Sequence, residues 1–374
     1  MARRSLNRDP SLHSFSWDRP LVLFESDGWG RVGVRDKEGY ELLRAARITL
    51  GQHPYDFYSL ETAEDLAAIS ALLERHHDST GRSPCLVMNF LTANLDFRKM
   101  AEAGFEQIHL LPLSKALPGN WKRPGLLEAY RQGISRGVFY PAMQGLTQFC
   151  RPAVEYALAH DSERRELLET LWRAETPFIY WRMPWVGYEY FNPEKPKPGF
   201  LPAAAQADLI RLAAEAFARL FKVFPKSASA PGNQANPDTS QAWSKWGIQV
   251  AQSAGTPSPP HFDEWGILHT YRSIEFEPVQ RELPIEKYVQ LADACFSRGM
   301  PAIVSMNSIN FHSTLRNFRD PALQMLDQFL SALERQFPDL LYLHETDLYS
   351  LVTRGRFDAG HGSVSLTVRR QIAN

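Results

Sequence analysis

The sequence predicts an α/β protein built as a distorted (β/α) TIM-like barrel with one aromatic, Pro-rich insertion. Short apolar segments alternate with longer amphipathic ones along most of the 374 residues, which is typical of parallel strands joined by helices. Polar residues directly follow several expected strands, as site residues do at the carboxyl ends of barrel strands. Barrels with insertions reach this length as one unit, so a single domain over residues 1–374 is expected.

In the first half, continuous apolar runs mark the expected strands, and apolar residues at helical spacing mark the expected helices. The strands are expected at 21–24, 84–90, 107–111 and 137–140, and the helices at 63–76 and about 149–172.

The segment 175–202 interrupts this alternation. It contains Trp181, Trp185 and Tyr188 among further aromatic residues and six prolines. So many prolines disfavour a barrel helix, and so many aromatic residues disfavour a disordered linker. We expect an insertion that packs over the barrel as a lid or side wall, either stacking on sugar rings or packing on the barrel flank.

The alternation resumes after this insertion with a helix at 203–221. Further strands are expected at 227–230, 248–250, 268–276, 302–305 and 340–343, and further helices at 240–246, 284–298 and 321–337.

Composition excludes several classes of function. Lys and Arg number 41 against 42 for Asp and Glu, so the net charge of −1 provides no basic surface for nucleic acid. No apolar run approaches the roughly 18 residues needed to cross a bilayer, and the basic start Met1–Arg4 is not followed by one. Three widely spaced cysteines fit reduced thiols, so a cytoplasmic protein without membrane insertion is expected.

Five blocks, in order, resemble the polysaccharide deacetylase superfamily, in particular a long-chain branch associated with bacterial O-antigen and capsule genes. The branch's E-S-D-D-W-G, N-P-D-F, P-Q-F-H-G-R-E-H, R-N-x-x-F-E-P and P-A-I-I-S-x-H-R-x-N-Y phrases correspond to 25–30, 94–97, 141–148, 272–278 and 301–311. The resemblance spans roughly residues 20 to 350. It implies a deacetylase-like barrel with its site at the carboxyl ends of the strands.

Deacetylases of this superfamily use one Asp as general base, an Asp and two His as metal ligands, and a further His as general acid. The resemblance places Asp27 at the base position, but Gly28, Gln144 and Gln148 at the three ligand positions. Asn307 stands at the general-acid position. Amides and glycine supply neither the charge nor the basicity that zinc prefers, so no metal and no other cofactor is expected.

The expected catalytic residues are therefore Asp27 and Asn307. Asp27 either acts as a base or substrate acceptor, or simply caps a turn. Gln144, Gln148 and Asn307 form an amide cluster that either binds sugar hydroxyls and an oxyanion, or satisfies itself as a buried network.

The remaining expected substrate-binding residues are Trp29, Arg31, Glu275 and Glu277. Arg31 closely follows the first block and either orients a carboxylate or phosphate or is a surface side chain. Glu275 and Glu277 lie two residues apart in one expected strand, a spacing that favours one face. They either line the cavity for acid–base work or form salt bridges at its edge.

These residues support three hypotheses. The first is a metal-independent enzyme of surface-polysaccharide biosynthesis that transfers or hydrolyses an acyl or amide group on a sugar. The second is a non-catalytic glycan-binding protein. The third is a metal-dependent deacetylase whose site is rebuilt from unmatched histidines, namely His261, His269, His312 and His344. Whether the chain is an enzyme, and how it assembles, is open at this point.

Overall fold

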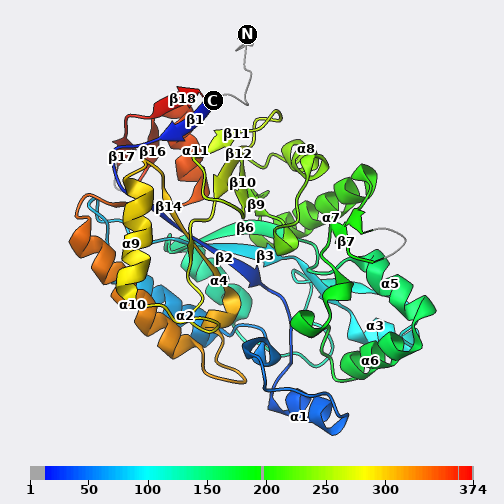
Figure 1. Cartoon of the computed structure of the whole chain (residues 1–374). Coiled ribbons are helices and arrows are strands. Elements are labelled where there is room, and N and C mark those ends of the chain that lie inside the picture. The colour runs from blue at the N-terminus through cyan, green and yellow to red at the C-terminus, as the bar shows by residue number, and fades with distance from the viewer. Residues whose placement is uncertain (1–12, 195–197, 361, 373–374) are drawn as a thin grey trace.

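The fold is a strongly curled sheet of twelve strands with helices packed around it (Figure 1). The computed structural model describes residues 13–194, 198–360 and 362–372. The central strands are all parallel to their neighbours, which gives the distorted TIM-like barrel that the sequence predicts. In spatial order these strands are β13 (Ile274–Glu275), β14 (Ala302–Asn307), β2 (Leu21–Trp29), β3 (Leu86–Leu91), β6 (Phe139–Gly145), β9 (Ser227–Ser229), β10 (Val250–Ser253) and β12 (Leu268–Tyr271).

The two ends of this parallel sheet are joined by one stretch of chain. Tyr271 ends β12, which pairs with β10, and Ile274 begins β13, which pairs with β14. The expectation of one strand over 268–276 is therefore wrong, because the chain changes partner in the middle. Arg272 and Ser273 lie at this crossing, and their backbone N–H groups donate to Ser253 O (3.1 Å) and Ile303 O (3.0 Å).

Three short strands extend the sheet beyond the barrel in antiparallel fashion. They are β11 (His261–Phe262), β1 (His13–Ser16) and β18 (Arg369–Ile372). β1 and β18 lie side by side, so both ends of the described chain meet at one edge of the fold (Figure 1). A further strand, β15 (Leu341–Leu343), runs parallel to the first residues of β2.

Two further sequence expectations are corrected by local structure. The strand expected at 107–111 appears as β5 (Leu110–Pro112), which pairs only with β4 (Ala93–Leu95) and stays outside the barrel. The single helix expected at 149–172 is two helices, α5 (Arg151–His160) and α6 (Ser162–Arg173). Asp161 separates them because its carboxylate accepts the N–H of Arg164 and caps the second helix.

The other helices except α11 pack on the outside of the sheet. They are α1 (Lys37–Ala45), α2 (Ala63–Leu73), α3 (Phe97–Glu102), α4 (Leu126–Ser135), α7 (Ala203–Phe221), α8 (Pro237–Lys245), α9 (Ile285–Phe296) and α10 (Arg319–Gln336). The helix α11 (Glu345–Arg354) packs against the inward side chains at the start of β2, where its Leu348 and Leu351 share a buried cluster with Leu21 and Leu23. Across the described ranges, no helix has the length and apolar character that crossing a membrane requires.

Alternation along β2 explains how the barrel creates a site. Val22 and Phe24 join the core that packs under the helices, whereas Leu21 and Leu23 join the cluster that contains residues of β10, β12 and β14. The inward positions are apolar at the start of the strand and become Glu25 and Asp27 at its end. The barrel interior therefore has an apolar floor and a polar upper layer.

Within the insertion, the 3₁₀ turns Tyr180–Arg182 and Pro184–Val186 and the strand pair β7 (Phe191–Asn192) and β8 (Gly199–Phe200) replace a regular helix. Residues 195–197 lie outside the described part of the chain.

Candidate functional site

A cavity of about 730 Å³ opens at the carboxyl ends of the barrel strands. Seven of the eight residues expected to form the site line it: Asp27, Arg31, Gln144, Gln148, Glu275, Glu277 and Asn307. They come from segments far apart in the chain, and the parallel strands bring them together because their carboxyl ends share one rim.

Trp29 is the exception, and its expected contact with substrate is wrong. Its side chain is fully buried and stacks on Phe311 with ring centroids 6.1 Å apart. Inward and outward positions alternate along β2, so Asp27 faces the interior. A bulge between Asp27 and Trp29 then turns Trp29 into the outer core.

The floor of the cavity contains a bidentate ion pair between Arg272 and Asp27. Nη1 donates to Asp27 Oδ2 (2.7 Å), Nη2 donates to Oδ1 (2.8 Å), and Nε donates to Glu25 Oε2 (2.9 Å). Asn89 Nδ2 also donates to Asp27 Oδ1 (2.8 Å). Burial opposes the charge on Arg272, but Asp27 and Glu25 raise its pKa overall. Both oxygens of Asp27 are thus engaged within the protein.

Glu345, the first residue of α11, adds a third carboxyl group beneath this pair. It is completely buried, and burial followed by the nearby charge of Glu25 raises its pKa well above the usual value. Burial also raises the pKa of Glu25, although Arg272 opposes this. One guanidinium cannot balance three carboxylates, so the protonated form of Glu345 is favoured here.

Glu277 is the cavity residue whose titration is best placed for proton transfer. Burial raises its pKa to about 7, and the hydrogen bonds from Asn310 and Asn307 only partly oppose this shift. Asn307 Nδ2 donates to Oε1 (2.6 Å) and Asn310 Nδ2 donates to Oε2 (2.7 Å). A fixed carboxyl group that titrates near neutral pH can both accept and return a proton.

The residues that the sequence resemblance places around a metal do not fit a divalent ion. Gln144 Oε1 already accepts the backbone N–H of Gly28 (2.9 Å), and Asp27 is held by the Arg272 guanidinium. Gly28 has a φ of +90°, a conformation that favours glycine. Among residues 13–194, 198–360 and 362–372, no group of three or more His, Cys, Asp or Glu side chains is arranged to hold a metal. The rebuilt metal site therefore has no ligand group in this part of the chain.

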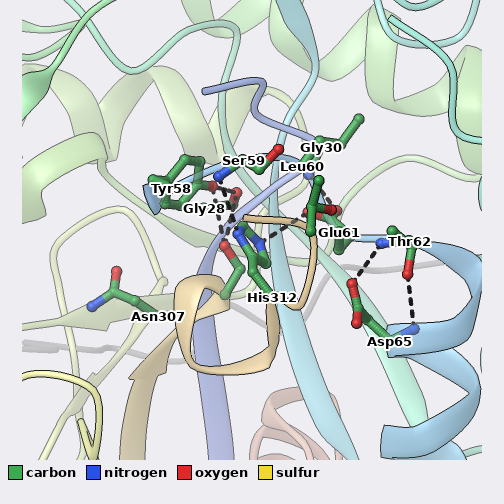
Figure 2. A network of polar contacts seen from close by, with 12 residues as sticks. Gly28, Gly30, Tyr58, Ser59, Leu60, Glu61, Thr62, Asp65, Asn307 and His312 are labelled. Carbon is green, nitrogen blue, oxygen red and sulfur yellow. Dashed lines mark hydrogen bonds and ion pairs between the residues drawn. The ribbon is translucent and has the colours of Figure 1, made fainter. Parts of the chain in front are cut away.

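A buried network fixes the loop after β2 beside the cavity (Figure 2). Glu61 Oε1 accepts the N–H of Gly30 (2.8 Å), and the Tyr58 hydroxyl donates to Gly28 O (2.6 Å). His312 Nε2 lies 3.6 Å from Glu61 Oε2, and its Nδ1 accepts the N–H of Ser59 (3.4 Å). His312 is thus a buried positioning residue in this structure.

Several cavity residues carry no signal in the sequence. His53 caps the 3₁₀ turn Pro54–Phe57, which contains Tyr55, and Asn233 ends the 3₁₀ turn Pro231–Asn233. Neither segment has a recognisable motif, yet all three residues line the wall. Arg272 begins the sequence block 272–278, but its ion pair with Asp27 is evident only from the fold. The aromatic insertion contributes Tyr180, Trp181 and Tyr188 to the wall, whereas Trp185 packs under Arg164 instead, 4.7 Å from its guanidinium carbon.

No protein-family model matches the chain, and no curated protein does. Among solved structures, the fold is similar to one described as a polysaccharide deacetylase from Mycobacterium smegmatis, with 11% identity, a TM-score of 0.47, and 94% of this chain and 93% of that one covered. A second such protein, from Pseudomonas aeruginosa PAO1, is 9% identical with a TM-score of 0.47 and coverage of 90% and 93%. A 4-α-glucanotransferase from Thermococcus litoralis is 11% identical with a TM-score of 0.48 and coverage of 90% and 41%. The likeness concerns the general course of the chain and does not extend to the reaction.

Proposed function

We propose that the protein is a metal-independent, carbohydrate-active enzyme that hydrolyses or transfers an acyl or amide group on a sugar. The observation that carries this proposal is Glu277, a buried carboxyl group in the cavity whose pKa is raised by burial to about 7. Groups shifted in this way by burial within a cleft are candidates for acid–base catalysis.

In hydrolysis, the carboxylate of Glu277 would take a proton from water as the water oxygen bonds to the acyl carbon. The carbonyl electrons move to oxygen, where the side-chain amides of Gln144 and Gln148 can donate hydrogen bonds. When the bond between the acyl carbon and the sugar oxygen or nitrogen breaks, Glu277 returns the proton to the leaving atom.

This scheme gives Asp27 and Asn307 roles that differ from those expected from the resemblance. Asn307 would hold and orient Glu277 through its 2.6 Å hydrogen bond. Asp27 would hold the Arg272 guanidinium in the cavity floor through the bidentate ion pair that its two oxygens form. Both residues are positioning residues in this proposal.

The biological setting of the proposal is bacterial surface-polysaccharide assembly in the cytoplasm. Its support is the ordered set of sequence blocks in residues 25–30, 94–97, 141–148, 272–278 and 301–311. Cys85, Cys150 and Cys295 are free and buried, which is compatible with a reducing compartment.

A non-catalytic glycan-binding protein is the second candidate. Trp181 and Tyr188 are 40% and 37% exposed at the cavity wall, and flat exposed aromatic rings suit the apolar faces of sugars. This candidate needs the same cavity but no proton transfer.

Release of acyl groups from a panel of O- and N-acylated glycans separates the two candidates. We expect turnover by the wild type and a kcat lower by about 10²- to 10⁴-fold in Glu277→Gln, the usual contribution of one general acid–base group. Glu286→Gln, an exposed carboxylate on α9, is the matched control. Binding of the glycans without turnover by the wild type would favour the glycan-binding candidate.

A further inference from the structure

Arg31 presents a charged group to the cavity in an unusual setting. Its guanidinium carbon lies 4.0 Å from the ring centroid of Tyr58 and 4.7 Å from that of Tyr180. The guanidinium is therefore fixed by two aromatic faces, which stabilise a cation without neutralising it. The side chain lines the cavity together with Tyr180.

The charge of Arg31 has no carboxylate partner within the described part of the chain. Arg272, the other arginine in the cavity wall, is paired with Asp27 and Glu25. For Arg31, no ion pair is formed, and Nε is buried without a hydrogen-bond partner. A partly buried guanidinium without a partner costs free energy, and a bound anion would remove that cost.

Gly28 lies close to the group that holds this guanidinium. A Cβ atom placed on Gly28 would lie 3.2 Å from Ser308 Oγ, 3.3 Å from the Tyr58 hydroxyl and 4.0 Å from Arg31 Nη2. A side chain at this position would therefore crowd Ser308 and Tyr58, and Tyr58 provides one of the two rings beside Arg31.

We infer that the substrate is an acidic sugar, whose carboxylate or phosphate group binds the guanidinium of Arg31. This inference deepens the proposed function by naming the substrate class, and rests on it for the identity of the reacting sugar. The planar guanidinium can donate two parallel hydrogen bonds to either oxyanion. A cavity of about 730 Å³ is large enough for the sugar and its acidic group.

The inference is tested by equilibrium binding of glucose, glucuronic acid and glucose 6-phosphate to the wild type, Arg31→Lys and Arg31→Met. We expect at least one acid to bind the wild type about 10- to 100-fold more tightly than glucose, as one charge-assisted contact allows. Arg31→Met should lose this preference, and Arg31→Lys should retain part of it as a point charge. Which acid binds more tightly distinguishes a carboxylate from a phosphate.

Equal affinity of the wild type for acids and glucose, failure of both acids to bind at millimolar concentration, or an undiminished preference in Arg31→Met would overturn the inference. Arg31→Lys keeps the test valid if Arg31→Met does not fold, as judged by its circular dichroism spectrum. Glu277→Gln separates this inference from the proposed function. If that variant keeps the preference and the wild type shows no turnover, the proposed reaction fails while the acidic ligand stands.

Discussion

Arg272 and Asp27 form a bidentate ion pair at 2.7 and 2.8 Å across the interior of the barrel, between the crossing from β12 to β13 and the carboxyl end of β2. Arg272 lies at the crossing between β12 and β13, where the chain passes from one end of the sheet to the other. The pair therefore links the segment that closes the barrel to a side chain in the floor of the cavity.

Removing the guanidinium should destabilise the protein strongly. Arg272→Met leaves the charges of Asp27 and Glu25 buried without a partner, which typically costs about 3–5 kcal/mol. We expect urea denaturation to show a free energy of unfolding reduced by that order. Adding Glu25→Gln and Asp27→Asn to the variant should recover part of the loss, because the unpaired charges are then absent. Wild-type stability of the single variant would contradict this role for the pair.

Asn307 should set the pH above which the proposed reaction proceeds. Its donated hydrogen bond favours the ionised form of Glu277, so Asn307→Ala should raise the pKa of Glu277 further above about 7. If Glu277 must be ionised to accept a proton from water, kcat/KM rises with pH through this pKa. We expect the rising limb of the profile to move up by about one pH unit in Asn307→Ala. Asn317→Ala, which removes an exposed amide, is the control and should leave the profile unchanged. A rising limb at the wild-type pH in Asn307→Ala would argue against this role for the hydrogen bond.

Glu189 should make folding stability depend on pH. It accepts the N–H groups of Leu146 (3.1 Å) and Thr147 (2.8 Å) at the end of β6, and burial raises its pKa from 4.5 to about 7. Because the folded state holds this proton more tightly, its contribution to stability is fully present below pH 4.5 and is lost as pH rises through 7. In Glu189→Gln, the fall in unfolding free energy over this window should be shallower by about 1.4 kcal/mol per pH unit. Denaturant titrations with the same slope in both proteins would refute this.

Trp181 should contribute to sugar binding. Its ring is 40% exposed and is held by a stack on His53 at 4.5 Å and by donation from Nε1 to Asp56 Oδ1 at 2.8 Å. We expect Trp181→Ala to bind the preferred sugar roughly 2- to 10-fold more weakly, and to melt at a lower temperature because the buried Asp56 loses this donor. Phe224→Ala, an exposed aromatic residue that is not part of the cavity wall, is the control. Equal affinities in the two variants would place the sugar elsewhere in the cavity.

The sequence predicts the barrel well where burial controls the pattern. The helix at 203–221 has the predicted bounds, and most barrel strands lie within a few residues of the expected ranges. The sequence-based prediction fails where pairing with a distant strand determines whether a segment joins the barrel. The apolar run before Leu111 carries the pattern of a barrel strand, but pairing with β4 removes it from the barrel. Likewise, nothing local shows that β12 changes partner at Arg272.

The candidate site shows the same division. Strand ends are readable, so Asp27, Gln144 and Asn307 could be placed at one rim before the fold was known. The acid–base role could not be assigned, because it depends on the burial of Glu277 and on Asn310, which only the fold brings to it. In contrast, Trp29 was misplaced because a bulge in β2 changes the direction of its side chain.

The measurement that tests the account most directly is the titration of carboxyl groups by difference infrared spectroscopy in the wild type, Glu277→Gln and Glu189→Gln. Burial raises the pKa of both glutamates to about 7, so the wild type should show carboxyl groups that ionise near that pH. Glu277→Gln should lose the signal of the Glu277 carboxyl group, while Glu189→Gln should retain that signal and lose the one from Glu189. If Glu277→Gln leaves the signal near pH 7 unchanged, Glu277 ionises at a different pH. The proposed proton transfer at neutral pH is then contradicted.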